Sequence, residues 1–215
     1  MMENTEISNI RRDYLYTGLD EASINNNPFA QFSNWMDEAL KSNLIDPSAM
    51  ILATTDKNAF PSVRVVLLKR IDSDGFVFYT NYDSRKGKEL LENPNASVLF
   101  FWKELERQIR IEGKVEKISQ KESEEYFHSR PYESQLAAWA SDQSSTIPGR
   151  EFLEKKYEEL KKKFEGKEIP LPPFWGGLKL KPDYFEFWQG RENRLHDRIC
   201  YKKDGSDWKK ERLAP

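Results

Sequence analysis

The chain has 215 residues, and its 34 basic and 36 acidic side chains leave a formal net charge of −2. This balance excludes recruitment of nucleic acid by a global positive field. A single cysteine excludes an internal disulfide framework, argues against a structural zinc site and suits a reducing compartment. The first residues carry no signal segment and no apolar run approaches bilayer length, so we expect a cytoplasmic protein.

The N-terminal part is expected to be a mobile segment followed by one domain. Residues 1–27 are polar and rich in asparagine, whereas 28–215 have the length of a single domain. Asn27-Pro28 predicts a helix start, with asparagine as the N-cap and proline at the first helical position. Apolar side chains between Phe29 and Leu40 then recur at helical spacing, so this helix should bury one face.

From residue 49 to residue 118 the chain is rich in β-forming residues. Ser73-Asp74-Gly75 predicts a hairpin turn, and residues 84–91 predict a short helix that ends at Asn93-Pro94. The stretches that we expect to be strands are 49–54, 62–71, 76–81, 96–102 and 107–118.

The second half combines helices and strands. Ser119-x-x-Glu122 is a capping box that starts a helix reaching Ser129. Many antiparallel strands with inserted helices predict a mainly β fold of the α+β class, a barrel with helical decorations. Further helices are expected at 134–140 and 150–164, and further strands at 178–181, 184–188, 194–202 and 208–213.

Two segments could bind phosphate at the first half of this sheet. In Arg64–Lys69, alternation puts Arg64 on one strand face and Lys69 on the other, although an edge strand with charged ends would look the same. Ser84-Arg85-Lys86-Gly87 opens a helix, where backbone N–H groups beside cations suit a phosphate. Cations at a helix N-terminus are unfavourable without an anion, so we favour a phosphate site over a basic cap.

A second phosphate-sized site is indicated by Tyr126, Arg130 and Ser134, which are spaced four residues apart. On an unbroken helix they would share a face, but Pro131 breaks the turn and re-aims Ser134. Three converging donors suit a phosphate. An ordinary helix end with a C-terminal arginine is the alternative.

The segment Trp188–Arg198 gathers an indole, a glycine, three arginines and a histidine. If 194–201 is a strand, alternation puts Arg194, His196 and Arg198 on one face. Burying such a face is costly unless an anionic or hydrogen-bonding partner meets it, which indicates a planar, negatively charged ligand. A hairpin whose charges face water is the alternative.

The side chains offer binding groups more readily than reactive ones. No Gly-x-Ser-x-Gly elbow occurs, Cys200 has no clear base, and two histidines exclude a His-rich metal site. A cofactor is therefore expected to carry the reaction.

From about residue 11 to residue 215 the chain resembles the pyridoxine/pyridoxamine 5′-phosphate oxidase family of flavin enzymes. Ala137 departs from the glycine that we expect there, which concerns helix packing more than chemistry. The resemblance is carried by Arg11-Arg12-Asp13-Tyr14, Arg64–Lys69, Phe78-Tyr79-Thr80-Asn81, Ser84-Arg85-Lys86-Gly87, Ser129-Arg130-Pro131, Ser134-Gln135, Gln143-Ser144-Ser145, Trp188–Arg198 and Arg212-Leu213-Ala214-Pro215.

The resemblance implies an FMN-binding split β-barrel of antiparallel Greek-key type, a homodimer with FMN in two clefts at the subunit interface. By matching position, the residues implied for FMN are Arg64, Val65, Val66, Leu67, Lys69, Tyr79, Thr80, Arg85, Lys86, Gln108, Gln143, Ser144, Trp188 and Arg198. Those implied for the phosphorylated substrate are Arg11, Tyr14, Lys69, Tyr126, Arg130, Ser134, Arg194 and His196.

The resemblance also implies the reaction. A hydride equivalent would pass from C4′ of pyridoxine 5′-phosphate or pyridoxamine 5′-phosphate to flavin N5, giving pyridoxal 5′-phosphate, with ammonia released from the amine. Dioxygen would reoxidise the flavin and become hydrogen peroxide. Arg194 and His196 would be the catalytic groups, positioning and polarising the pyridine ring, and Arg11–Tyr14 would be a substrate lid.

Two alternatives remain at this point. One is a split-barrel flavin reductase or oxidase of other specificity, which the complete set Tyr126, Arg130 and Ser134 argues against. The other is a non-catalytic binder of FMN or pyridoxal phosphate, which substrate-dependent peroxide formation would exclude.

Overall fold

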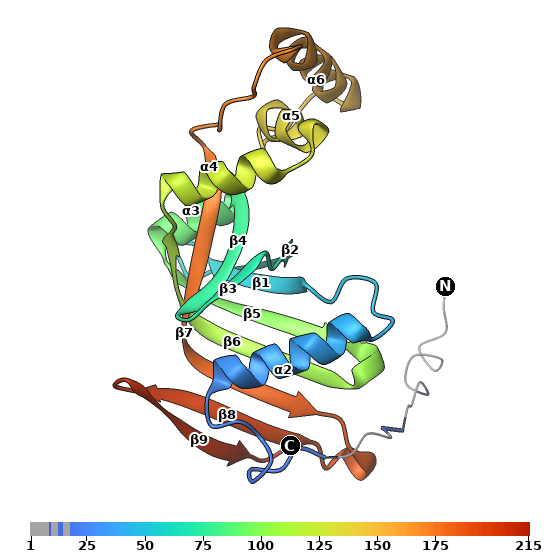
Figure 1. Ribbon diagram of the computed structural model, residues 1–215, viewed down its shortest axis with the longest axis vertical. Helices are drawn as coiled ribbons and strands as arrows, with labels where there is room; N and C mark the ends of the chain where they lie inside the picture. The colour runs from blue at the N-terminus through green and yellow to red at the C-terminus, as the bar shows by residue number, and fades with distance from the viewer. Residues whose placement is uncertain (1–8, 10–12, 15–17) are drawn as a thin grey trace. The chain divides into compact units, whose positions relative to one another are not determined.

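The computed structural model describes residue 9, residues 13–14 and residues 18–215 (Figure 1). The expected helices are confirmed to within a few residues, and their N-caps follow the sequence: Asn27, Ser84 and Ser119 each accept a hydrogen bond from the first turn. The capping box of Ser119 and Glu122 is formed. The helices are α2 (Pro28–Lys41), α3 (Arg85–Glu92), α4 (Gln120–Ser129), α5 (Tyr132–Ala140) and α6 (Arg150–Phe164), with two short 3₁₀ turns, η1 (Lys103–Leu105) and η2 (Glu192–Arg194).

The strands pair in the order β2-β1-β5-β6-β7-β4-β3, with β8 pairing to β7 and β9 to β8. The pairs β1–β2, β3–β4, β4–β7, β7–β8 and β8–β9 are antiparallel. The bounds are β1 (Ala49–Thr55), β2 (Pro61–Leu67), β3 (Arg70–Asp72), β4 (Gly75–Asn81), β5 (Asn95–Trp102), β6 (Arg107–Lys117), β7 (Trp175–Gln189), β8 (Asp197–Asp204) and β9 (Asp207–Leu213).

The single strand expected over 62–71 is wrong, because the chain changes partner in its middle. Leu68 N donates to Ser48 O at 2.9 Å, beyond the end of β1, whereas Lys69 N donates to Val77 O of β4 at 2.9 Å. The segment therefore divides into β2 and β3. Buried and exposed side chains nevertheless alternate across the break, as predicted: Val66 and Leu68 are buried, and Lys69 is exposed.

The two short strands expected at 178–181 and 184–188 are also wrong, since they form one strand, β7. Its first part pairs with β4, from Trp175 to Leu180, and its last part pairs with β8, from Tyr184 to Gln189. Pro182 lies between the two pairings, where its missing N–H interrupts neither the pairing with β4 nor that with β8.

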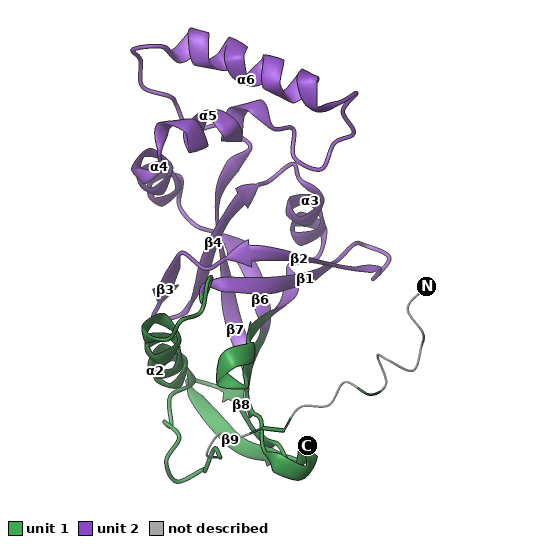
Figure 2. Cartoon of the chain, turned by 90° about the vertical axis from the view of Figure 1, so that its right-hand side faces the viewer, with its two compact units in different colours: residues 1–47, 99–111, 184–215 green, residues 48–98, 112–183 purple. Residues whose placement is uncertain are grey.

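The chain divides into two compact units, coloured separately in Figure 2: residues 1–47, 99–111 and 184–215 form unit 1, and residues 48–98 and 112–183 form unit 2. Unit 1 has an aromatic core. Phe32 packs on Phe100 with ring centroids 5.1 Å apart, and Phe187 contacts both Trp35 at 5.3 Å and Tyr201 at 5.7 Å. Edge-to-face pairs of this kind stabilise beyond the area that they bury.

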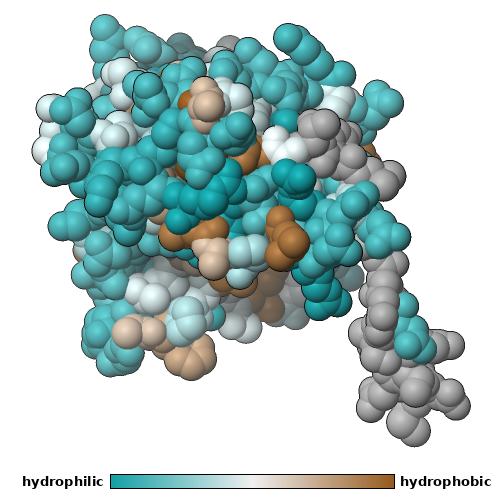
Figure 3. Space-filling model, turned by 90° about the horizontal axis from the view of Figure 1, so that it is seen from below, coloured by the Kyte–Doolittle hydropathy of each residue, from teal (hydrophilic) through white to brown (hydrophobic). Residues whose placement is uncertain are grey.

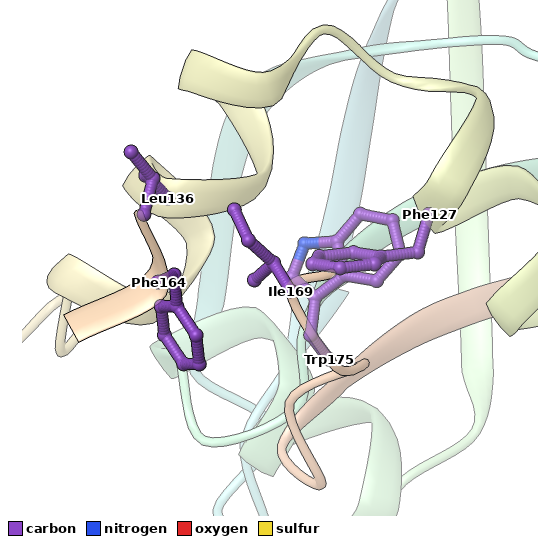
Figure 4. Packing of buried hydrophobic residues seen from close by; sticks show 5 residues of the cluster. All are labelled: Phe127, Leu136, Phe164, Ile169 and Trp175. Atoms are coloured by element: carbon purple, nitrogen blue, oxygen red, sulfur yellow. The ribbon is translucent and has the colours of Figure 1, made fainter. Parts of the chain in front are cut away.

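Unit 2 contains a hydrophobic cluster that joins its three C-terminal helices to the start of β7. Figure 4 shows the ring of Phe127 beside the indole of Trp175, with Ile169 next to them and Leu136 and Phe164 on the other side. Every member is at most 8% exposed. Because Trp175 is the first residue of β7, this cluster fixes the end of that strand against α4.

The face of the molecule shown in Figure 3 is mostly hydrophilic, with hydrophobic side chains in small separate groups. This agrees with a chain in which 33% of residues are charged. Among the described residues, no helix is long and apolar enough to cross a membrane.

Candidate active site

Unit 2 contains a cavity of about 600 Å³ at the ends of β2 and β4 and beside α4 and α5. Most of the residues implied for FMN and for substrate phosphate in this unit line it. The lining residues are Val65, Val66, Leu67, Lys69, Tyr79, Thr80, Asn81, Lys86, Tyr126, Arg130, Pro131, Ser134, Ala137, Ala138, Ser141, Gln143 and Trp175.

Lys86 provides a cation to this cavity from the first turn of α3. Its Nζ donates to Thr80 Oγ1 at 3.0 Å and to Gln143 Oε1 at 2.8 Å, so the three implied FMN ligands meet at one point. Burial, and then the positive charge of Arg64, lower the pKa of Lys86 to about 8. An anion at this point would favour the charged form of Lys86 and so raise its pKa.

Gly87 shows why α3 begins where it does. A Cβ added at this residue would lie 2.1 Å from the carbonyl oxygen of Tyr82, so only glycine lets the helix approach the preceding loop this closely. Ser84 Oγ accepts from Gly87 N at 3.3 Å. The sequence Ser84–Gly87 is therefore a tight strand-to-helix turn that directs the side chain of Lys86 toward the cavity.

Arg130 provides a second cation. It is the C-cap of α4, with an extended backbone, and Pro131 is the N-cap of α5. This break brings Tyr126, Arg130 and Ser134 to the wall of one cavity, as the sequence predicted. Among the described residues, Arg130 Nη1 is the one buried side-chain nitrogen or oxygen without a hydrogen-bond partner. Burial lowers the pKa of its guanidinium.

An aromatic stack supports Arg130. The guanidinium carbon lies 4.8 Å from the ring centroid of Trp175, and the rings of Tyr79 and Tyr126 stack 3.7 Å apart beside it. A cation over an indole face is favourable, but it satisfies no N–H group. Sequence reasoning missed Trp175; its place beside Gly176-Gly177, after the proline-rich stretch, was the available signal.

Arg64, Arg85 and Ser144 are not among the residues that line this cavity. Arg64 and Arg85 bind Glu89 instead, at 3.1 Å and 2.8 Å. Arg85 and Ser144 line a neighbouring cavity of about 400 Å³, which shares Gln143 with the first.

Unit 1 holds the implied residues of the C-terminal segment. His196 lies 4.7 Å from the ring of Trp188 and 5.0 Å from that of Tyr14, measured between ring centroids. Its Nδ1 accepts from Arg191 N at 3.1 Å, which leaves the proton of the neutral ring on Nε2. Burial, and then the charge of Arg194, lower the pKa of His196, so its ring is neutral at pH 7.

The strand expected over 194–202 begins only at Asp197, so the argument that Arg194 and His196 share a strand face is wrong. Asn193 and Arg194 have φ values of 56° and 60°, in the left-handed region, and two such residues cannot continue a strand. The 3₁₀ turn η2 and the loop after it present Arg194, which is exposed.

The remaining predicted residues are located as follows. Gln108 lies on β6 and is half-buried. Arg198, on β8, donates from Nε to Glu186 at 2.9 Å and from Nη1 to Ala214 O at 2.8 Å. Arg11 lies outside the described residues.

Comparison with known proteins gives the family. The family model described as "Pyridoxamine 5'-phosphate oxidase" matches residues 36–164, and that of the "Pyridoxine 5'-phosphate oxidase C-terminal dimerisation region" matches residues 175–215. The chain belongs to the pyridoxamine 5′-phosphate oxidase family. It is 53% identical to the pyridoxine/pyridoxamine 5′-phosphate oxidase of Gloeothece citriformis over 97% of this chain and 98% of that protein. The corresponding protein of Rubrobacter xylanophilus is 50% identical, over 98% and 97%.

Solved structures confirm the predicted fold class of this oxidase-family chain. PhzG from Burkholderia lata, crystallised with tetrahydrophenazine-1-carboxylic acid, superposes with a TM-score of 0.88 at 32% identity, covering 95% of this chain and all of that one. An FMN-binding protein of Nostoc punctiforme, 17% identical, superposes with a TM-score of 0.72 over 89% of this chain and all of that one. The fold is an antiparallel split barrel with helical decorations.

Proposed function

We propose that this protein oxidises pyridoxine 5′-phosphate and pyridoxamine 5′-phosphate to pyridoxal 5′-phosphate with FMN as its cofactor. With the amine, water and dioxygen are consumed and ammonia and hydrogen peroxide are released; with the alcohol, dioxygen is consumed and hydrogen peroxide released. The observation that carries the proposal is the buried, unpartnered Arg130 Nη1 in a cavity that already holds a second cation, Lys86. A phosphorylated cofactor and a phosphorylated substrate need two cationic groups, one for each phosphate.

The residues present fit FMN. Lys86, Thr80 and Gln143 form a compact polar cluster that suits a phosphate group, and the apolar strand residues 65–67 line the same cavity. When bound, FMN supplies the two-electron acceptor that no side chain of this protein can replace. Trp188, Gln108 and Arg198 are assigned to the flavin ring by the family resemblance.

The substrate phosphate is assigned to Arg130 with Tyr126, Ser134 and Lys69. Arg130 needs an acceptor for Nη1, and a phosphate oxygen provides one at small reorganisation cost because the guanidinium is already held over Trp175. Burial raises the pKa of Tyr126, so its hydroxyl stays protonated and donates.

Arg194 and His196 are assigned to the pyridine ring of the substrate. A neutral His196 whose Nε2 carries the proton can donate a hydrogen bond there, and Arg194 adds a fixed positive charge. Tyr14, which packs on His196 and Trp188, is assigned to the lid that limits access of water.

We also propose that the protein is a cytoplasmic homodimer. The match of residues 175–215 to a dimerisation region supports the dimer. So does an exposed apolar face on the β1–β2 hairpin, where Ile51 pairs with Val65, next to Val63 and Leu67. The single cysteine supports the reducing compartment.

The test is an oxidase assay of the FMN-loaded protein with pyridoxamine 5′-phosphate, measuring pyridoxal 5′-phosphate, ammonia and peroxide together. Equal amounts of all three support the proposal. The second candidate is oxidation of an unphosphorylated tricyclic carboxylate, which the likeness to PhzG favours. Turnover of a tetrahydrophenazine carboxylate, with none of the phosphorylated amine, would replace the first function with the second.

A further inference from the structure

Glu89, on α3, is a buried carboxylate to which the proposed reaction gives no role. It is 4% exposed, and both of its oxygens accept hydrogen bonds. Oε2 accepts from Thr54 Oγ1 at 2.5 Å, from Ser62 Oγ at 2.6 Å and from Arg64 Nη2 at 3.1 Å. Oε1 accepts from Arg85 Nε at 2.8 Å. One side chain therefore ties α3 to both β1 and β2.

The carboxylate is charged at every pH at which the protein would work. Burial by itself would raise the pKa of Glu89, but the hydrogen bonds from Ser62, Thr54, Arg85 and Arg64 outweigh it and lower the pKa to about 2. A buried charge that lost these partners would be strongly unfavourable. Glu89 and its four partners therefore stabilise one another, and loss of one partner weakens the whole network.

This network fixes the position of the Arg64 guanidinium. Nη1 donates to Leu52 O at 3.4 Å and to Thr54 Oγ1, and Nη2 donates to Ser62 Oγ at 2.5 Å and to Glu89. These four bonds use all the hydrogens on the two Nη atoms of Arg64. Among the described residues, its Nε–H has no hydrogen-bond acceptor. Arg85 and Glu89 line the neighbouring cavity, which shares Gln143 with the first. The positive charge of Arg64 also contributes, after burial, to the lowered pKa of Lys86.

We propose that Glu89 is a positioning residue for the phosphate group of FMN. It holds Arg64 on the strand side and Arg85 on the helix side, and so fixes the positive charge around Lys86 before the cofactor arrives. This inference rests on the proposed use of FMN. Riboflavin has the same ring system and no phosphate, so its affinity does not depend on Glu89.

The experiment is to titrate the flavin-free protein with FMN and with riboflavin, following flavin fluorescence, for the wild type and for Glu89→Gln. A glutamine has one oxygen and one NH₂ group. In either orientation its NH₂ group faces a donor, which is Arg85 on one side or Thr54, Ser62 and Arg64 on the other. We expect the Kd for FMN to rise about tenfold or more. The Kd for riboflavin should change less than about twofold.

The matched control is Glu159→Gln, which removes the same charge from an exposed helical position on α6, away from both cavities. It should leave both Kd values as they are. Equal weakening of FMN and riboflavin by Glu89→Gln would show a merely structural role, and unchanged or tighter FMN binding would also overturn the inference.

If Glu89→Gln does not fold, Ser62→Ala carries the test, because it removes the hydroxyl that joins Arg64 to Glu89. The same selective loss of FMN is expected, at about threefold; equal loss of both flavins overturns the inference. A wild type that binds FMN no more tightly than riboflavin would instead contradict the phosphate pocket of the proposed function itself.

Discussion

Arg130 is the residue on which the substrate assignment depends most directly. Its environment contains aromatic rings and, apart from Tyr126 and Ser134, little that could satisfy a guanidinium. Buried arginines are normally paired, so an unpaired Nη1 indicates a partner that arrives from solution.

We therefore predict that Arg130→Ala raises the KM for pyridoxamine 5′-phosphate by roughly 10- to 100-fold, the value of a hydrogen-bonded charge pair. The variant should lose its preference for the phosphorylated amine over pyridoxamine, while its Kd for FMN is unchanged. Steady-state kinetics with both amines measure this. Arg150→Ala, at an exposed position on α6, is the matched control. An Arg130→Ala variant that keeps the wild-type preference would contradict the assignment.

The lowered pKa of Lys86 predicts that FMN binding depends on pH. Its pKa in the free protein is about 8, and a bound phosphate dianion would raise it, so above pH 8 binding must be accompanied by proton uptake. The affinity for FMN is therefore full below pH 8 and falls above it, by up to about tenfold per pH unit.

Fluorescence titrations between pH 6.5 and 9.5 measure this dependence. Riboflavin should show a flat profile, because it lacks the phosphate. Lys86→Arg should flatten the profile for FMN as well, because a guanidinium stays protonated throughout this range. A wild-type affinity for FMN that does not change up to pH 9.5 would contradict the role of Lys86.

The same residues show how far sequence reasoning reaches. The spacing of Tyr126, Arg130 and Ser134 and the proline between them were sufficient to predict their convergence. The pairing of Arg64 with Glu89 was not, because a contact between a strand and a helix 25 residues away leaves no local pattern. Trp175 was missed for the same reason, since its partner Arg130 lies on another element.

Among the boundaries of helices and strands, helix starts were the most predictable. Asn27 and Ser119 act as N-caps, as predicted, because capping depends on neighbours within three residues. Ser84 caps α3 in the same way. Strand ends were less predictable. The division between β2 and β3 depends on Leu68 and Lys69 pairing with different strands, which local sequence does not encode. The late start of β8 follows from the left-handed backbone of Asn193 and Arg194.

The turn into α3 gives a prediction about stability. Gly87→Ala would bring a Cβ within 2.1 Å of Tyr82 O, a backbone atom that cannot move alone. We expect a loss of roughly 1–3 kcal/mol in the free energy of unfolding, as for other overpacked sites. Thermal or urea denaturation measures it.

Gly149→Ala is the control, because no atom lies within 4 Å of a Cβ added there and its φ of 174° is ordinary extended backbone. Gly149 is the N-cap of α6, where alanine is less favourable than glycine, so this variant should lose no more than about 0.5–1 kcal/mol. A Gly87→Ala variant as stable as Gly149→Ala would show that the close approach is not required.

The fold class of the protein followed from many short strands with inserted helices, and the family resemblance indicated the split barrel. The oligomeric state did not follow from pattern alone. The match of 175–215 to a dimerisation region and the apolar face of the β1–β2 hairpin now support a second copy of this chain.

We predict that sedimentation equilibrium gives twice the 25.4 kDa mass of one chain. Val63 is 68% exposed on this apolar face, so Val63→Asp should weaken association by about tenfold or more without changing the fold. Asn58→Asp, which adds the same charge at the exposed tip of that hairpin, is the control. A wild type that is a monomer at micromolar concentration would contradict the dimer.

In the proposed reaction, a flavin bound to this protein accepts electrons from a phosphorylated vitamin B6 amine. The decisive measurement is the absorbance spectrum of the FMN-loaded protein, recorded without oxygen before and after addition of pyridoxamine 5′-phosphate. We predict that the flavin band bleaches on addition and returns when oxygen is admitted. A flavin that stays oxidised in the folded, FMN-loaded protein would contradict the proposed reaction.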